Sequence, residues 1–295
     1  MANVKPSKAL NRRDVLKLFQ AALIEASLVS VGGMTYRLVS APSDFRVEIL
    51  RLTLPRLTPA FDGLRIAQLS DVHIGGWMDA ERLQEVIELV KAQNPHLVVI
   101  TGDFLIGHGF NKSSRQAIVD LIDLLTPLAQ SLPVYAVLGN HDYWTNVHAV
   151  RDMLLTTGIR NLTNTAYTLR SGSEQLHIAG VDDVWEGHVR LDEVVRKLPT
   201  EGAAILLAHE PDFAERSAQT GRFDLQLSGH SHGGQIVLPG FGAPILPFLA
   251  KKFPSGLYQV GNMLQYTNRG IGMARLPIRL NCPPEITIFE LKART

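Results

Sequence analysis

Five short apolar runs in this sequence each end in a small group of polar residues. The runs are of strand length, and aspartate, asparagine or histidine follows each of them, often beside a glycine. They occupy residues 64–70, 96–101, 134–138, 203–208 and 224–228. Because ligands bind beyond the carboxyl ends of strands in open α/β sheets, we expect the five polar groups to meet at one place.

The polar groups contain the residue types that bind metal ions. In chain order they are Asp71-Val72-His73, Gly102-Asp103, Gly139-Asn140-His141-Asp142, His209 and Gly229-His230-Ser231-His232. Five of the ten histidines of the chain lie in these groups. Each group alone occurs often by chance, so the order of all five carries the prediction.

The pattern between these runs predicts a mixed α/β fold. Leu83, Val86, Ile87 and Val90 have helical spacing, with Asp79 as the N-cap. Further helices are expected around residues 118–125 and 147–157, with another of about 8 residues from position 212. Residues 161–181 are predicted to form a hairpin, and residues 285–291 a last strand. Pro127 and Pro133 are expected to bound the segment between the helix and the strand of residues 134–138.

Composition limits the partners and the kind of metal site. The formal net charge is +1, so no global field attracts nucleic acid, and a nucleic-acid-coating role is excluded. A single cysteine, Cys282, excludes both an intramolecular disulfide and a cysteine-based zinc site. Any metal must therefore be held by histidine, aspartate and asparagine.

The N-terminal residues 1–41 are predicted to be a targeting segment, followed by one catalytic domain over residues 42–295. Arg12, Arg13 and Lys17 precede a moderately apolar stretch, which resembles a twin-arginine export signal. The segment is interpreted as a cleaved signal or an uncleaved anchor in the cell envelope. The alternatives are a place at the cytoplasmic face of the membrane and a surface amphipathic helix.

The five groups together resemble the motif set of the calcineurin-like metallophosphoesterases over residues 61–240. Gly233-Gly234-Gln235 and residues 276–286 further resemble the exported or membrane-associated YkuE-like branch of that family. The resemblance implies a four-layer α/β/β/α sandwich with mixed sheets and two metal ions. Imidazoles mixed with carboxylate and amide oxygens suit Mn, Fe or Zn better than Ca²⁺.

The resemblance also implies a role for each residue. One metal would be held by Asp71, His73, Asp103 and His232, and the other by Asp103, Asn140, His209 and His230. His141 would protonate the leaving group or stabilise the phosphoryl oxygens. Asp142 is interpreted either as orienting His141 or as a helix cap.

The expected activity is hydrolysis of phosphomonoesters or phosphodiesters by a hydroxide that bridges the metals. Two divalent ions carry four positive charges, and the two aspartates contribute two negative charges. The site therefore keeps a net positive charge, which attracts a phosphate ester. One alternative is a lipid-directed pyrophosphohydrolase for a substrate of the UDP-2,3-diacylglucosamine type. Another is a non-catalytic envelope-binding module.

The apolar stretch 236–253 is expected beside the site. Pro239, Pro244 and Pro247 exclude a regular helix or a central strand there. The stretch is interpreted as a wall that contacts a membrane surface or a lipid-linked phosphate, with Lys251 and Lys252 at head-group level, or as ordinary packing. Two arginines, Arg269 and Arg279, are either phosphate clamps or structural residues.

Overall fold

Two six-stranded sheets form the centre of the computed structural model, which describes residues 44–107, 109–274 and 277–294. The first sheet has the order β1 (Arg46–Leu54), β12 (Glu285–Ala293), β2 (Arg65–Leu69), β3 (Leu97–Thr101), β4 (Val134–Val137) and β5 (Arg160–Asn161). The second has the order β10 (Gly256–Val260), β11 (Met263–Thr267), β9 (Leu225–Ser228), β8 (Ala203–Leu207), β7 (Glu174–Gly180) and β6 (Thr165–Ser171). The predicted segment 1–41 lies outside the described residues.

Both sheets are mixed. Strands β2, β3, β4 and β5 are parallel neighbours, whereas β12 runs antiparallel to β2. In the second sheet β7, β8, β9 and β11 are parallel, with β6 and β10 antiparallel at the two edges. The predicted hairpin is the pair β6 and β7, so this prediction is confirmed.

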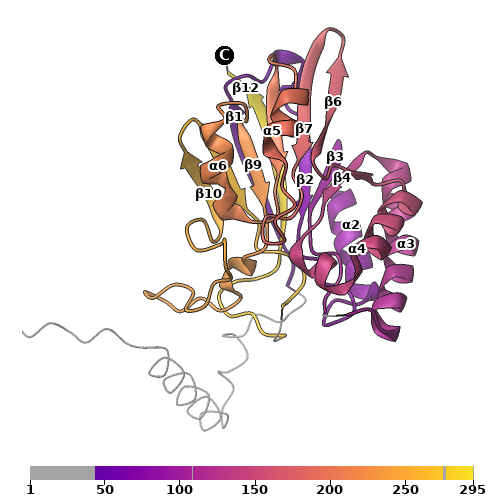
Figure 1. Cartoon of the computed structure of the whole chain (residues 1–295). Helices are drawn as coiled ribbons and strands as arrows, with labels where there is room; N and C mark the ends of the chain where they lie inside the picture. Colours follow the sequence, from indigo (N-terminus) through magenta and orange to yellow (C-terminus); the bar gives the residue numbers. More distant parts are fainter. Residues whose placement is uncertain (1–43, 108, 275–276, 295) are drawn as a thin grey trace, which may run out of the picture.

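Three hydrophobic cores separate four layers. One core lies between the first sheet and helices α2 (Ala80–Ala92), α3 (Lys112–Ser131) and α4 (Asn140–Thr157). A second fills the space between the sheets, and a third joins the second sheet to α5 (Leu191–Lys197) and α6 (Ala214–Gln219). Figure 1 shows the two groups of helices on the outer faces, which confirms the α/β/β/α sandwich.

Strand β3 shows why the apolar runs of the sequence do not alternate between apolar and polar residues. Its five residues are all buried. Val98 and Ile100 face the helix layer, and Leu97 and Val99 face the other sheet, because consecutive side chains point to opposite faces. A strand covered on both faces has no polar side, which distinguishes it from the strands of a one-sided sheet.

The helices confirm part of the prediction and correct part of it. Helix α2 buries the predicted face, and the Asp79 side chain accepts a hydrogen bond from Arg82 N. Helix α3 continues through Pro127 to Ser131, so the expected bracket at Pro127 is wrong. Pro127 lies on the exposed face of α3, where water can hydrogen-bond to the carbonyl that the proline leaves unpaired.

Two further helices match their predicted positions but differ in form. The predicted helix 147–157 is confirmed as the second part of α4, because Asn146 has non-helical φ and ψ and its side chain accepts a hydrogen bond from Ala149 N at 3.0 Å. The first part of α4, from Asn140, was not predicted. Its first turn consists of site residues, so it lacks the apolar period by which the sequence is read. The helix expected from position 212 is a 3-10 turn, Pro211–Phe213, followed by α6. Among the described residues, no helix is both long and apolar enough to cross a membrane.

Candidate metal centre

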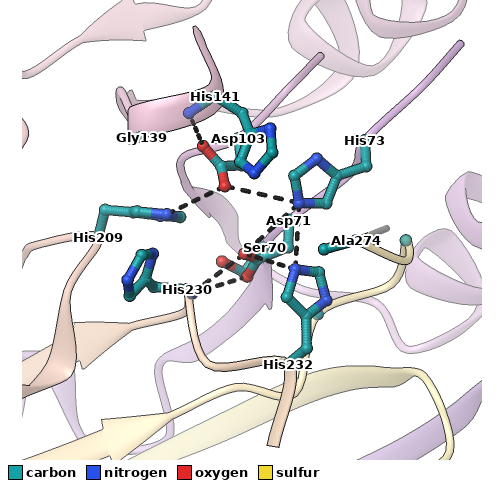
Figure 2. A network of polar contacts seen from close by, with 12 residues as sticks. Ser70, Asp71, His73, Asp103, Gly139, His141, His209, His230, His232 and Ala274 are labelled. Carbon is teal, nitrogen blue, oxygen red and sulfur yellow. Dashed lines mark hydrogen bonds and ion pairs between the residues drawn. The ribbon is translucent and has the colours of Figure 1, made fainter. Parts of the chain in front are cut away.

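The five polar groups lie together at one edge of the sandwich, as predicted. Asp71 and His73 follow β2, Asp103 follows β3, and the group 139–142 follows β4. His209 follows β8, and His230 and His232 follow β9. Figure 2 shows the imidazoles and the two carboxylates from both sheets pointing toward one another.

Five of these residues have left-handed backbone. They are Asp71 (φ 50°), His73 (φ 49°), Asp103 (φ 57°), His230 (φ 68°) and His232 (φ 51°). This conformation is uncommon for residues with a Cβ and costs energy, so it persists only where the surroundings impose it. Its concentration at one place marks a functional site.

Two glycines allow the loops to approach the acidic residues. A Cβ at Gly139 would overlap Asp103 Oδ1, and a Cβ at Gly229 would overlap Ser70 Oγ and Asp71 Oδ2. Close backbone approach therefore requires glycine at both positions. This explains why glycine precedes Asn140 and His230 in the sequence.

The first cluster consists of Asp71, His73 and His232, whose ligand atoms lie within 4.8 Å of one another. His73 Nε2 lies 3.1 Å from His232 Nε2, and His232 Nε2 lies 3.4 Å from Asp71 Oδ1. All three side chains are buried. Two imidazole nitrogens that face each other beside a carboxylate have the arrangement of ligands around a cation.

The second cluster consists of Asp103, His209 and His230, again within 4.8 Å. His209 Nε2 lies 3.2 Å from Asp103 Oδ2, and the same oxygen lies 3.5 Å from His73 Nε2. Asp103 therefore faces both clusters. Asn140 is buried, and its Oδ1 has no hydrogen-bond donor among the described residues, so this oxygen is available to a metal ion.

Backbone carbonyls orient three of the imidazoles. His73 Nδ1 lies 3.2 Å from Leu105 O, and His209 Nδ1 lies 2.7 Å from Thr101 O. His230 Nε2 lies 2.8 Å from Phe248 O. A ring N–H that donates to a carbonyl leaves the other nitrogen as the lone pair toward the site, as in metal-binding histidines.

Two imidazoles of the site are neutral, as cation binding requires. Burial lowers the pKa of His73 to about 3 and that of His230 to about 4, so both rings are neutral. Burial also raises the pKa of Asp71 to about 6. For Asp103 burial acts in the same upward direction, but the His209 and His141 imidazoles outweigh it and hold the pKa well below its ordinary value.

His209 carries the opposite shift. Burial acts to lower its pKa, but the Asp103 carboxylate outweighs burial and raises the pKa well above its ordinary value. A positive charge is thus stabilised between His209 and Asp103. A divalent ion would supply that charge instead of the proton, so the residues present fit divalent metal ions.

Asp142 holds the loop that carries Asp103. Its carboxylate accepts hydrogen bonds from the main-chain N–H groups of Asp103 (3.1 Å), Phe104 (2.8 Å), Leu105 (3.3 Å) and Gly139 (3.0 Å). The hydrogen bond from Gly139 N is a capping bond at the start of α4, as the helix-cap interpretation predicts. The three bonds to residues 103–105 are long-range contacts that the sequence does not reveal.

Glu210 and Asp183 are buried acidic residues that the sequence interpretation missed. Glu210 accepts hydrogen bonds from Val184 N at 3.1 Å and Trp185 N at 3.0 Å. Burial and the neighbouring Glu210 charge raise the pKa of Asp183 to about 9, so the Asp183 carboxyl keeps its proton at neutral pH. The position of Glu210 directly after His209 was the one available signal.

The two arginines considered as phosphate clamps have structural partners. Arg279 is fully buried and donates to the carbonyls of Gly270 at 3.0 Å and Gly272 at 2.6 Å, among others. Arg269 pairs with Glu48 at 2.8 Å and with Glu285 at 2.5 Å. These contacts favour the structural interpretation for both.

The stretch 236–253 contains no helix or strand, as its prolines predicted. Its contact with the site is the hydrogen bond between Phe248 O and His230 Nε2. Phe241, Ile245 and Phe248 are 66%, 70% and 57% exposed. The stretch therefore lies beside the site and presents apolar side chains to solvent.

A four-layer sandwich with clustered acidic and imidazole ligands at its edge defines a metal-dependent hydrolase of phosphoric esters. The comparisons with known proteins agree with this class. Residues 64–234 match the family model described as calcineurin-like phosphoesterase, and the chain belongs to that family. Divalent metal ions are the cofactors to which the family and the clusters point.

Several relatives are similar over most of the chain. The uncharacterized metallophosphoesterase YkuE of Bacillus subtilis is 35% identical over 97% of this chain and 99% of its own length. The phosphodiesterase YaeI of Escherichia coli is 31% identical over 90% of this chain and 95% of its own. A transmembrane protein with metallophosphoesterase domain from Danio rerio is 32% identical over 92% of this chain and 62% of its own.

Proposed function

We propose that the chain hydrolyses phosphomonoesters or phosphodiesters at a centre of two divalent metal ions. The position of Asp103 between the two clusters is the observation that carries this proposal. One ion would be held by Asp71, His73, Asp103 and His232, and the other by Asp103, Asn140, His209 and His230. Mixed nitrogen and oxygen ligands suit Mn, Fe or Zn.

The bound ions would supply Lewis-acid activation of water and charge for the phosphoryl oxygens. The chain itself supplies the arrangement. The main-chain N–H of His141 donates to Asp103 Oδ1 at 2.8 Å, and His230 N donates to Asp71 Oδ2 at 3.0 Å. These bonds fix the two carboxylates before any substrate arrives, as preorganised electrostatic catalysis requires.

His141 is the proposed catalytic residue beside the ligands. Its ring lies edge-on to that of His73, with centroids 4.7 Å apart, and the residue is only half-buried. It can therefore touch both the metal centre and a substrate. We assign it proton donation to the leaving oxygen or stabilisation of the phosphoryl oxygens, and we assign Asp142 the positioning of Asp103.

Hydrolysis of bis(p-nitrophenyl) phosphate by the metal-loaded protein tests this function. We expect metal-dependent turnover that falls about 10²- to 10³-fold in His141→Ala through lost stabilisation of the phosphoryl oxygens, since removing one such donor costs that factor. His148→Ala, an exposed histidine on the same helix, is the control and should retain full activity. A loss confined to diesters with alkyl leaving groups would assign proton donation, since p-nitrophenolate leaves without help.

Two results would contradict the proposal. One is the absence of hydrolysis by protein shown to contain metal. The other is full activity of His141→Ala with both kinds of leaving group, which would remove its catalytic role. The intact set of ligands speaks against the alternative of a non-catalytic envelope-binding module.

A lipid-linked substrate is the second candidate, favoured by the exposed Phe241, Ile245 and Phe248 beside the site. The substrate would be a pyrophosphate of the UDP-2,3-diacylglucosamine type at a membrane surface. Similarity to a relative that is named as a transmembrane protein supports a place at a membrane of the cell envelope, through the proposed signal or anchor 1–41. Lys252 is paired with Glu215 at 2.5 Å, so Lys251 is the better candidate for a head-group contact.

Acylated and deacylated nucleotide sugars distinguish this candidate. We expect the metal-loaded protein to hydrolyse the acylated form with a kcat/KM at least about 10-fold higher, because apolar contact adds roughly 0.8 kcal/mol for each buried CH₂. The measurement compares both substrates in detergent micelles and in their absence. Equal turnover of the two forms would exclude a lipid-directed role.

A further inference from the structure

An aromatic wall formed by Trp144, Trp185 and Phe248 lies beside the metal centre. The Trp185 ring is 5.3 Å from Trp144 and 5.5 Å from Phe248 between centroids, with interplanar angles of 87° and 82°. Trp185 also lies 5.6 Å from His230, and Trp144 lies 4.8 Å from His141. The wall therefore extends from the proposed catalytic histidine to a proposed metal ligand.

The wall stands where a substrate can reach the centre. The seven proposed ligands are all buried, whereas His141 is half-buried. Trp185 is 38% exposed and Phe248 is 57% exposed. A phosphate that reaches the ligands beside His141 and His230 therefore brings its organic group against these rings.

The loops that carry the wall, and the Trp144 ring, are held by hydrogen bonds. The Glu210 carboxylate accepts from the main-chain N–H of Trp185 at 3.0 Å, one residue after His209. Trp144 Nε1 donates to Glu186 Oε1 at 2.8 Å, and Glu186 N donates to Asp183 Oδ1 at 2.7 Å. The carbonyl of Phe248 accepts from His230. The wall is thus fixed to the same loops that position the metal ligands.

An exposed tryptophan on a loop held by these hydrogen bonds favours a flat ligand. Aromatic rings prefer offset-stacked or edge-to-face contact, and a wall of nearly perpendicular rings offers both to a flat group. An aliphatic group gains only the buried area. We propose that the aromatic wall binds a planar aromatic group attached directly to the phosphate of the substrate, such as an aryl ester. This inference rests on the proposed phosphoesterase function, whose substrate class it narrows.

Binding of phenylphosphonate and cyclohexylphosphonate to the metal-loaded protein tests the wall. The two probes share the phosphonate and nearly share size, but only phenylphosphonate is flat and aromatic. Calorimetry should give a Kd roughly 3- to 10-fold lower for phenylphosphonate, the range expected for an aromatic contact beyond its area. Trp185→Ala should bring the ratio of the two Kd values to about 1, and Trp185→Phe should keep most of the preference.

Leu155→Ala is the control, because Leu155 is an apolar side chain that is 81% exposed near the C-terminal end of α4, outside both the aromatic wall and the stretch 236–253. It should leave both Kd values unchanged. The ratio of the two probes cancels any change that a variant causes in metal content, since both need the same ions. Equal Kd values in the wild-type protein, or a ratio of Kd values unchanged in Trp185→Ala, would contradict the proposal that the aromatic wall binds an aromatic group. Absence of ester hydrolysis would instead overturn the phosphoesterase proposal, because the binding measurement needs no turnover.

Discussion

Asp103→Asn is expected to lower hydrolysis of bis(p-nitrophenyl) phosphate on the order of 10³-fold or more, a loss typical of removing a central electrostatic group. Asp103 faces both clusters, with its Oδ2 at 3.2 Å from His209 Nε2 and 3.5 Å from His73 Nε2. Asparagine keeps the size but removes one of the two negative charges. Its amide nitrogen also cannot serve as a ligand, so the shared position is lost for one ion at least.

Metal analysis of the purified variant separates loss of an ion from loss of chemistry alone. We expect the wild-type protein to contain about two ions per chain when loaded and Asp103→Asn to contain one or none. Asp192→Asn, at an exposed position of α5, is the control for an acidic residue outside the site. Full metal content together with full activity in Asp103→Asn would refute the assignment of Asp103 as the shared ligand.

Asp142→Ala is expected to destabilise the protein by about 3 to 5 kcal/mol, because four buried main-chain N–H groups lose their acceptor. The Asp142 side chain accepts from four main-chain N–H groups, and alanine leaves them without that acceptor in a buried place. Each unsatisfied buried donor costs about 1 to 3 kcal/mol before relaxation or water entry. Asp142→Asn keeps one oxygen and should show a smaller loss.

Urea unfolding of the metal-loaded protein measures this effect. A loss of this size should also lower the Tm by roughly 10 °C, since about 1 kcal/mol corresponds to 2 to 4 °C in a domain of this size. Asp152→Ala, on the exposed face of the same helix, is the control and should change stability by less than about 0.5 kcal/mol. A loss under 1 kcal/mol in Asp142→Ala would show that water or another group replaces the carboxylate.

The sequence predicted the strands that carry the site, and the place of the site, because both depend on local order. Strands β1, β10 and β11 were not predicted. Strand β3 is apolar throughout since it is covered on both faces, and Asp103 follows it directly. The same rule placed His209 at the end of β8 and His230 after β9. Parallel strands bring their carboxyl ends to one edge of a sheet. The five polar groups could therefore be predicted to lie together without knowledge of any distance.

Features that depend on contacts between distant residues were not predicted. Asp142 accepts bonds from residues nearly forty positions away, which no periodicity reports. The raised pKa of Asp183 comes from its burial and from the neighbouring Glu210 charge. Pro127 stays within α3 because of its exposure, which depends on how that helix lies against the sheet. The structural role of Arg279 likewise depends on the carbonyl groups that surround its guanidinium.

The position of the metal centre at the common edge of both sheets has a consequence for the lifetime of the protein. His73 and His232 are 159 residues apart in the sequence, yet their ring nitrogens lie 3.1 Å apart. An ion bound between them would tie two sheets together across a very long loop, as a cross-link does, and would oppose their separation. Metal supply would then determine resistance to proteolysis as well as catalytic activity. A shortage of metal would lead to degradation of the protein in addition to loss of its activity.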